Sequence, residues 1–335
     1  MNKKLRYTIP LAMVGIVSLA ACSSGAASST DEATVSFAHM LAESQPWHEC
    51  GALEFQDYVE SADSGLTVDL FPAGQTQAST LEQLDAIDAG NLDITWATPA
   101  QLATRLEALS VFDAAYLFRD SDHLAATMES PVAQELWDEL RDEDGMRVIG
   151  AGYYGTRHVT SNIPVHTPDD LDGVKMRVLD APLWLDNGAA LGATPTPVPF
   201  SELYLALQQG VVDAEENPLP VIEAQSFDEV QEYVNLTGHT VAMMAVVISE
   251  DTWQELNAAQ QDTLVEAGQV LGDGVTSCTL EQEAALLETW SAADSEFTVN
   301  ADVDLDAFRA NVEDTLLPKY EDVWGDTYRA IQEIK

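Results

Sequence analysis

The sequence predicts an α/β protein with parallel strands. Short apolar or alternating runs are followed by segments with helical periodicity, and this order repeats along most of the 335 residues. With 46% hydrophobic residues and seven Trp, the chain has enough apolar side chains for a large core and about two domains. Strand–helix alternation of this kind is typical of sheets whose strands run parallel.

The first part of the chain shows the alternation most clearly. Three strands are predicted, over residues 34–38, 66–71 and 92–97. Helical periodicity predicts helices over residues 47–60, 79–89, 122–128 and 132–143. Gly90 lies just beyond the second helix, and Thr98 with Pro99 opens a further helix, as expected for helix ends and starts.

The same pattern continues toward the C-terminus. Further strands are predicted over residues 146–152, 156–161, 174–178, 211–214 and 241–248. Helices are predicted over residues 181–191 and 202–209, with another starting at Pro218 in the first-turn position that tolerates proline. From Trp253 onward the chain is predicted to be mostly helical.

The N-terminus has the features of a secretory signal. Lys3, Lys4 and Arg6 precede an uncharged, mostly apolar run over residues 9–19. That run is shorter than the roughly 20 residues of a spanning helix, so we expect residues 1–21 to be a signal peptide and not a membrane anchor.

A cysteine follows this segment at once. Leu19-Ala20-Ala21-Cys22 resembles the lipobox of bacterial lipoproteins, in which the Cys is lipidated and becomes the first residue of the mature chain. An ordinary signal peptide followed by an unmodified Cys is the alternative. Residues 22–32 are small and polar, which predicts a flexible tether.

The composition is strongly acidic. Lys+Arg number 14 against 57 Asp+Glu, so the formal net charge is −43. This excludes a nucleic-acid binder and a peripheral binder of anionic lipid, because both need a basic face. Loss of the three signal-peptide cations changes the net charge from −43 to −46, which indicates a highly solvated surface.

Catalytic and metal-binding motifs are absent from the sequence. It has no HExxH, no CxxC pair, no GxSxG and no Gly-rich phosphate loop. Asp302, Asp304, Asp306 and Glu313 match four positions of a calcium loop, but Ala307 stands where that loop needs Gly. We therefore expect no metal, no cofactor and no catalytic residues.

Two of the few Lys and Arg residues lie in one predicted strand. In residues 174–178, Lys175 and Arg177 share one face of the predicted strand. Arg177 lies at its C-terminal end, where ligands bind in open α/β sheets. A guanidinium there can hold a carboxylate through two parallel hydrogen bonds. The residues alone leave a structural ion pair open as the alternative.

Residues 171–218 carry a more specific signal. This block, which includes KMRV, PFSE and ALQQGVVDAEENP, resembles the solute-binding proteins of tripartite ATP-independent periplasmic (TRAP) transporters, of the C4-dicarboxylate-binding type. LTVDLFPAGQ, AGNLDITWA and GYYGTRHVTSN also look like segments of that family. The similarity extends from Val35 to about Trp324.

The resemblance implies a periplasmic-binding-protein (Venus flytrap) fold without catalysis. Two α/β lobes would close on a ligand, with strands crossing between them and a long helix bridging both. Lobe I would comprise residues 33–154 and 243–282, and lobe II residues 155–242 and 283–335.

The resemblance also implies the ligand-binding residues. Arg177, in the KxRV strand, would clamp the ligand carboxylate, and Arg157, in GTR, would be the second arginine. Asn217, in ENP, would donate to the ligand, and Phe200, in PFSE, would pack on it. A helix-capping role for Asn217 and a core role for Phe200 are the alternatives.

Other positions at strand ends or in loops could form the opposite wall of the site. They are His39, Trp47, Gln75, Trp96, Thr98 and Tyr154. Met40, Ser79 and Thr98 replace the Asn, Asp and Glu found in family members that bind large polyhydroxylated acids, which argues against a sialic-acid-like ligand. Glu215 is a seventh possible wall residue, and it replaces a Gln or small residue common in the family. In the cleft it would repel a second carboxylate or pair with an amine; a solvated acid is the alternative, and the one that we expect.

Two cysteines remain after signal cleavage, Cys50 and Cys278. An exported chain meets oxidising conditions, so they could form a disulfide, although their spacing leaves two separate thiols equally open. The lobe boundaries implied by the resemblance place both in lobe I, which favours pairing.

The resemblance implies a lipid-anchored receptor on the outer face of a bacterial membrane, or in the periplasm. It would capture a small organic acid and deliver it to the small and large TRAP membrane subunits, driven by an ion gradient. The membrane would be contacted only through the lipid anchor. A periplasmic α/β hydrolase or lyase is one alternative, which any turnover would support. A receptor for a sensor kinase is the other, which neighbouring genes for TRAP membrane subunits would argue against.

Overall fold

The computed structural model describes residues 32–292 and 295–335. The expected signal peptide, Cys22 and almost all of the expected tether lie outside the described residues. Within these two ranges, no helix is both long enough and apolar enough to cross a bilayer.

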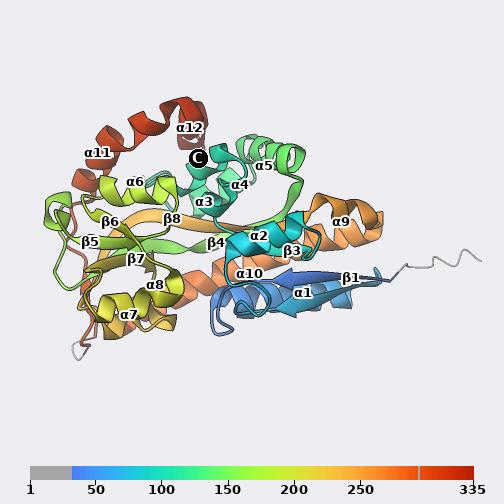
Figure 1. Ribbon diagram of the computed structural model, residues 1–335, viewed down its shortest axis with the longest axis horizontal. Coiled ribbons are helices and arrows are strands. Elements are labelled where there is room, and N and C mark those ends of the chain that lie inside the picture. Colours follow the sequence, from blue (N-terminus) through green and yellow to red (C-terminus); the bar gives the residue numbers. More distant parts are fainter. Residues whose placement is uncertain (1–31, 293–294) are drawn as a thin grey trace, which may run out of the picture. The chain divides into compact units, whose positions relative to one another are not determined.

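One mixed sheet of nine strands organises the described chain (Figure 1). Its strands are β1 (Ala33–Ala38), β2 (Leu66–Phe71), β3 (Ile94–Ala97), β4 (Met146–Ser161), β5 (Lys175–Val178), β6 (Thr194–Pro197), β7 (Ala214–Pro218), β8 (Tyr233–Ser249) and β9 (Thr298–Asn300). Their order across the sheet is β2-β1-β3-β8-β4-β7-β5-β6, and β9 pairs with β8.

The expectation of parallel strands is correct for the outer strands and wrong for the centre. β1 pairs in parallel with β2 and β3, and β5 pairs in parallel with β6 and β7. β8 is antiparallel to β3 and β4, and β4 is antiparallel to β7. Alternation along the sequence indicates which segments are strands, but the direction in which the chain enters β4 and β8 depends on the path between distant segments.

The two central strands are longer than the sequence predicts. Residues 146–152 and 156–161 form a single strand, β4, whose register against β8 shifts at three places. One shift lies at Gly155, whose φ of +130° favours glycine. β8 begins at Tyr233 and not at Val241, and β7 begins at Ala214, where the predicted strand over 211–214 would have ended.

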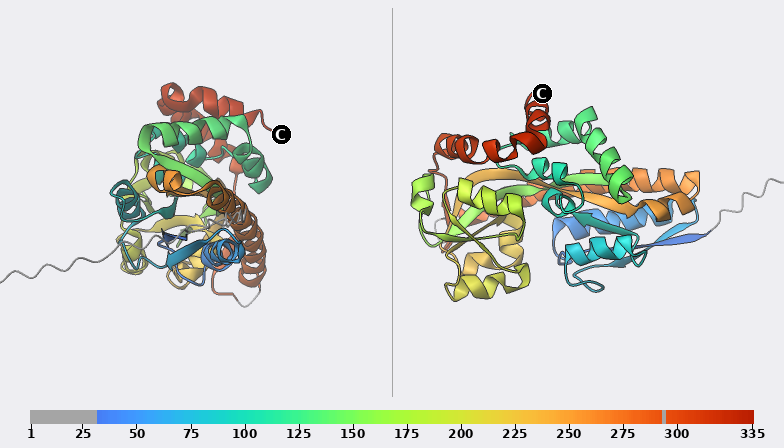
Figure 2. Two further views of the ribbon diagram at one scale, coloured as in Figure 1. Left: turned by 90° about the vertical axis from the view of Figure 1, so that its right-hand side faces the viewer. Right: turned by 45° about the horizontal axis from the view of Figure 1, so that its top comes forward.

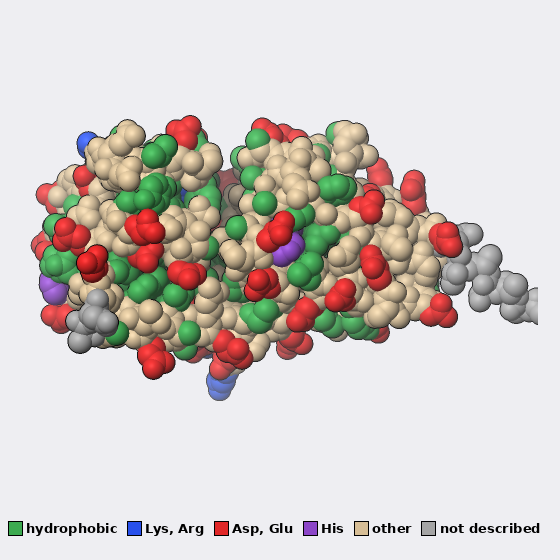
Figure 3. All heavy atoms as spheres, turned by 90° about the horizontal axis from the view of Figure 1, so that it is seen from below, with side chains coloured by type: hydrophobic (Ala, Val, Ile, Leu, Met, Phe, Trp, Pro, Cys, Tyr) green, Lys and Arg blue, Asp and Glu red, His purple; other side chains and the backbone are tan. Residues whose placement is uncertain are grey.

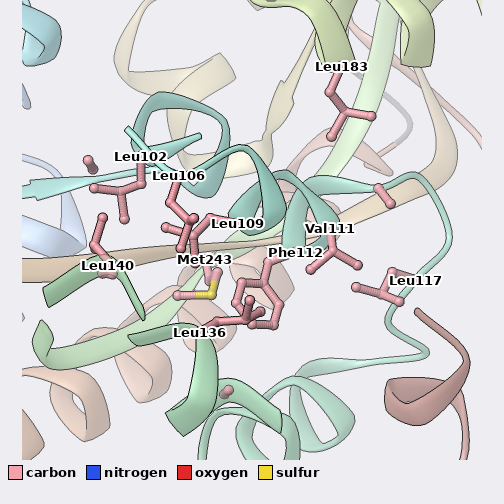
Figure 4. Close-up of a cluster of buried hydrophobic side chains, with 14 of the residues drawn as sticks. Leu102, Leu106, Leu109, Val111, Phe112, Leu117, Leu136, Leu140, Leu183 and Met243 are labelled. Atoms are coloured by element: carbon pink, nitrogen blue, oxygen red, sulfur yellow. The ribbon is translucent and has the colours of Figure 1, made fainter. Parts of the chain in front are cut away.

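β8 explains why both faces of the sheet are covered. Val241, Met243, Ala245 and Val247 belong to one buried cluster, and Met244, Val246 and Ile248 belong to another. Because successive side chains point to opposite faces, this continuous apolar run fills two cores at once. Figure 4 shows Met243 of the first cluster among Leu109, Phe112 and Leu136.

Helices cover these faces. The helices are α1 (Leu53–Ser61), α2 (Thr80–Asp88), α3 (Pro99–Leu102), α4 (Ser121–Met128), α5 (Pro131–Asp144), α6 (Pro182–Ala190), α7 (Leu203–Gln208), α8 (Leu219–Ala224), α9 (Glu250–Glu255), α10 (Ala258–Trp290), α11 (Leu305–Thr315) and α12 (Leu317–Gln332). Most lie within a few residues of their predicted ranges. The lobe boundaries stay a prediction, although Tyr320 and Trp324 of α12 pack in the same cluster as Leu109 and Phe112.

The 33-residue helix α10 is the long bridging element (Figures 1 and 2). It contacts α1 and β4, and farther along its length it contacts α8 and β9. Gly268 allows the helix to lie against β4, because a Cβ at this position would be 1.9 Å from the carbonyl oxygen of Ile149. Asn257 starts the helix with a capping box that includes Gln260.

A disulfide ties α10 to the region before α1. Cys50 lies in the π-helical turn His48–Ala52, and its Sγ is bonded to that of Cys278 on α10. The cross-link spans 228 residues of sequence. In the chain-entropy model, closing so long a loop restricts the unfolded state strongly.

Replacing both Cys50 and Cys278 by Ser should therefore lower the free energy of unfolding by up to about 5 kcal/mol. Urea unfolding of the double variant against the wild type measures this loss. Non-reducing peptide mass spectrometry of the wild type should show the Cys50–Cys278 link. Two free thiols, or equal stability of the two proteins, would contradict the structural role of the disulfide.

Candidate ligand-binding site

Arg177 is a buried cation without a carboxylate partner. It lies in β5 with 2% of its surface exposed. Its Nε donates to the carbonyl oxygen of Val198 at 3.0 Å, and its Cζ lies 5.6 Å from the ring centre of Phe200. Among residues 32–292 and 295–335, no Asp or Glu oxygen lies within 4.0 Å of a nitrogen of the Arg177 guanidinium. Burial, reinforced by the charge of Arg157, lowers the pKa of Arg177, while Glu216 and Glu215 oppose this effect.

Arg157 is close enough to interact with Arg177 but is neutralised. From β4, its Nε donates to Glu216 Oε2 at 2.5 Å and its Nη2 to Glu216 Oε1 at 2.9 Å. Nη2 also donates to the carbonyl oxygen of Glu216 at 2.6 Å and to Asn217 Oδ1 at 2.9 Å. Its Cζ lies 4.6 Å from the ring centre of Trp184. Arg157 therefore makes a fork-to-fork pair inside the protein.

Both ends of the Asn217 side-chain amide are hydrogen-bonded. Its Oδ1 accepts from Arg157, and its Nδ2 donates to Glu215 Oε2 at 2.5 Å. The helix-capping alternative is wrong, because the N-cap of α8 is Pro218. One proton of the Asn217 amide group is left over from these bonds, since the group carries two.

Glu215 is fully buried, so the expectation of a solvated acid is wrong. It neighbours Glu216 in β7, and pairing of β7 with β4 places it opposite Thr160. Burial raises the pKa of Glu215 to about 7, and the nearby charge of Glu216 adds to this effect. The sequence could not indicate this position, because an acid in an acidic chain is usually on the surface.

Three further polar groups lie around the Arg157–Glu216 pair. His239 Nε2 lies 3.2 Å from Glu216 Oε2. Burial opposes ionisation of Glu216, but Arg157 and His239 together hold the pKa of Glu216 below its usual range. Asp113 is also buried, and burial raises its pKa to about 7. Among the described residues, neither the Trp184 indole nitrogen nor Asp113 Oδ1 has a partner with hydrogen-bond geometry, although Trp184 is close enough to lower the pKa of Asp113.

The expected opposite wall is a group of stacked aromatic rings. The rings of His39 and Trp96 stack with centres 4.3 Å apart, and Trp96 meets Trp47 edge to face at 5.1 Å. The centre of Trp47 is 6.3 Å from that of Tyr154. Tyr154 in turn interacts with the charges of Arg157 and Arg177. Four of the seven expected wall residues are thus connected to the arginines.

The remaining expected residues are placed differently. Gln75 is exposed, and Thr98 caps α3 through a capping box with Gln101. No hydrogen bond or ring contact joins either of them to the group formed by the four aromatic wall residues within the described chain. Phe200 is 37% exposed, so the alternative of an ordinary core residue is wrong. Its ring meets Phe227 edge to face at 6.2 Å.

Comparisons with known proteins agree with this architecture. Residues 37–322 match the model of the bacterial extracellular solute-binding proteins of family 7, the DctP family. The chain belongs to this family. It is 35% identical to the sialic acid-binding periplasmic protein SiaP of Vibrio cholerae over 254 residues, which are 76% of this chain and 78% of SiaP.

Solved structures show the same fold. A TRAP periplasmic solute-binding protein of Roseobacter denitrificans, crystallised with 3-deoxy-D-manno-oct-2-ulosonic acid, superimposes with a TM-score of 0.85 at 28% identity, covering 91% of this chain and all of that one. A TRAP solute-binding protein of Polaromonas bound to D-erythronate gives 0.83 at 26% identity, covering 91% and 99%. This DctP-family protein therefore has the two-lobed α/β fold of binding receptors, not of enzymes.

Sequence reasoning missed several residues of this DctP-family site. Glu216 and Trp184 lie within the recognised block, but the residues give no sign that one neutralises Arg157 and the other faces it. Asp113 and His239 lie in distant segments, the helical turn Glu107–Asp113 and β8, so that only folding brings them to Glu216. Residue type gave no signal, because carboxylates are abundant throughout the chain.

Replacing Arg157 by Met should destabilise the protein strongly. The change leaves Glu216 buried without its cation, which costs about 3–5 kcal/mol in comparable buried pairs. Urea unfolding measures the loss, and Arg329→Met is a matched control. Arg329 also makes two ion pairs but is 56% exposed, so its loss should change stability little. Equal effects of the two substitutions would contradict a structural role for Arg157.

Proposed function

We propose that this protein captures a small organic acid outside the cytoplasm and delivers it to the membrane subunits of a TRAP transporter. The observation that carries the proposal is Arg177, which is buried, charged and without a carboxylate partner among the described residues. A buried cation without a counter-ion costs free energy, and a ligand carboxylate would supply the missing counter-ion. Asn217 would donate its remaining amide proton to the ligand.

The ligand would carry a single carboxylate. Arg157 already holds Glu216, so only the Arg177 fork is available on this side of the site. On the opposite wall His39 supplies no second cation, because burial, with His48 adding to it, lowers the pKa of His39 to about 3. The rings of Trp47, Trp96 and Tyr154 favour an uncharged body with some apolar surface.

The ligand would bind in the furrow between the two lobes. Figure 3 shows this furrow between the part of the surface near α7 and α8 and the part near α1 and β1. Closure of the lobes would remove water from the Arg177–carboxylate pair and strengthen it. Each hydrogen bond to a charged group contributes about 1.5–3 kcal/mol. Micromolar binding requires about −8 kcal/mol, which a bidentate pair and an apolar enclosure together can supply.

The receptor would be anchored through Cys22. The Leu19-Ala20-Ala21-Cys22 segment supports this assignment, and the tether that follows would let the folded part reach the transporter. We expect mass spectrometry of the N-terminal peptide from the membrane fraction to show a diacylglyceryl group on Cys22. A Cys22→Ser variant should appear in the soluble fraction. Unmodified Cys22 in a soluble mature protein would contradict the anchor.

A thermal-shift panel tests the ligand class. D-erythronate should raise the melting temperature, whereas erythritol, which lacks the carboxylate, should not. meso-Tartrate adds a second carboxylate to a four-carbon acid and should bind at least tenfold more weakly, because Arg157 is already paired with Glu216 and His39 is uncharged. Binding of erythritol, or equal binding of meso-tartrate, would contradict a single-carboxylate clamp. A panel of other carboxylates without any shift would contradict the proposed function itself.

The same assay identifies the clamp when it is repeated with Arg177→Lys and Arg177→Ala. Both variants should lose most of the affinity, because a point charge cannot replace the two parallel hydrogen bonds of a guanidinium. Circular dichroism should show that both variants remain folded, since Arg177 makes only one hydrogen bond within the described chain.

A further inference from the structure

Glu215 differs from Glu216, its neighbour in β7, in its partners. It is 0% exposed, and its Oε2 accepts from Asn217 Nδ2 at 2.5 Å. Its Oε1 lies 3.0 Å from the hydroxyl oxygen of Thr160. Within the described chain no Arg, Lys or His nitrogen forms an ion pair with it, whereas Glu216 has both Arg157 and His239.

The hydrogen bonds around Thr160 leave room for a proton on Glu215. The Thr160 hydroxyl oxygen lies 3.0 Å from Glu215 Oε1 and 3.3 Å from Gln231 Oε1. A hydroxyl group has one proton, so it cannot donate to both acceptors. Gln231 is oriented by its Nε2, which donates to the carbonyl oxygen of Val230. If Glu215 Oε1 carries a proton and donates it to Thr160, then Thr160 can donate to Gln231 and every group has a partner.

The charges that face Glu215 favour its protonation once an anion binds. Arg157 approaches from β4, Arg177 from β5, and Glu216 is adjacent on β7. Asp113 and His239 lie one step farther away, around Glu216. Before any ligand arrives, the two guanidinium groups therefore face the carboxyl groups of Glu215 and Glu216, and that of Asp113 lies farther away. A ligand carboxylate at Arg177 adds another negative charge to this buried set.

We propose that capture of a ligand carboxylate at Arg177 is coupled to uptake of a proton by Glu215. The inference rests on the proposed function, because it takes Arg177 as the clamp. Glu215 does not touch the ligand in this scheme. It is a positioning residue that orients the Asn217 amide, and its proton keeps the buried charges balanced when the anion binds.

The direction of the pH effect follows from the environment of Glu215. Burial raises its pKa to about 7, with Glu216 adding to this and Asn217, Thr160 and Arg157 opposing it. A bound anion raises the pKa further. Affinity should therefore be constant below about pH 7 and fall as the pH rises above that value, by about tenfold at pH 8. The fall ends above the pKa of the bound state.

Isothermal titration calorimetry tests the coupling. D-erythronate is titrated into the wild type at about pH 8 in phosphate and in Tris, whose ionisation enthalpies differ. The difference between the observed enthalpies should correspond to uptake approaching one proton. Glu215→Gln should bind without proton uptake and with an affinity that no longer depends on pH, because the amide donates to Thr160 as the acid does. Glu135→Gln removes an exposed acid and should behave as the wild type.

The Asp113→Asn variant tests whether Asp113 takes up the proton instead of Glu215. Proton uptake should persist in this variant. Uptake that survives Glu215→Gln, or that is absent from the wild type, would overturn the proposal.

If no D-erythronate binds at any pH, the proposed ligand class is in question, and the protonation of Glu215 is then measured on the free protein. The infrared difference between wild type and Glu215→Gln should then contain a protonated-carboxyl C=O band at about pH 6 that disappears by about pH 9. Its absence at about pH 6 would overturn the proposal.

Discussion

The pairing of Arg157 with Glu216 is the interaction on which the site depends. Two guanidinium groups are buried close enough to affect each other's pKa, and two such cations repel unless one is neutralised. Glu216 holds Arg157 through both of its carboxylate oxygens and its carbonyl oxygen, and His239 lies against the same carboxylate. Arg157 thereby becomes part of the structure, and Arg177 is left as the cation that needs a partner. The two arginines differ in role because Glu216 pairs with Arg157 and not with Arg177.

The scaffold places these groups on three neighbouring strands. Arg157 lies on β4, Glu215, Glu216 and Asn217 lie on β7, and Arg177 lies on β5. β4 continues past Gly155 to Tyr154, which connects the arginines to the rings of Trp47 and Trp96. The strand and helix α10 beside it therefore link both walls of the site. Gly268 allows close contact between them, because a Cβ at this position would overlap the carbonyl oxygen of Ile149.

The acidity of the surface and the chemistry of the site serve different purposes. Figure 3 shows acidic side chains spread over the face on which the furrow opens, with few Lys and Arg. A ligand anion is repelled at long range, although salt screens charges beyond about 8–10 Å. Attraction must come from buried groups at short range, where water is excluded and each interaction is stronger. This explains why the balance of charge within a small buried cluster matters more here than the net charge of −43.

The sequence by itself determined the family, most of the helices and strands, and the residue that carries the proposed function. Arg177 stood out because cations are scarce and because its segment is specific to a family. Periodicity placed Lys175 and Arg177 on one face of β5, yet Lys175 is exposed and Arg177 is buried. Arg177 contacts the Val198 carbonyl oxygen and the ring of Phe200 and lies near Arg157 and Glu216, groups that the tertiary structure brings to it.

Only the tertiary structure decided how the charged groups are partnered. Nothing in the run Glu215-Glu216-Asn217 shows that one acid neutralises an arginine on another strand while its neighbour is buried without a cation. The antiparallel direction of β4 and β8 was likewise decided by the path of the whole chain. Local patterns encode which segments are apolar and which are polar. The protonation and pairing of buried groups depend on distances between segments that are far apart in the sequence.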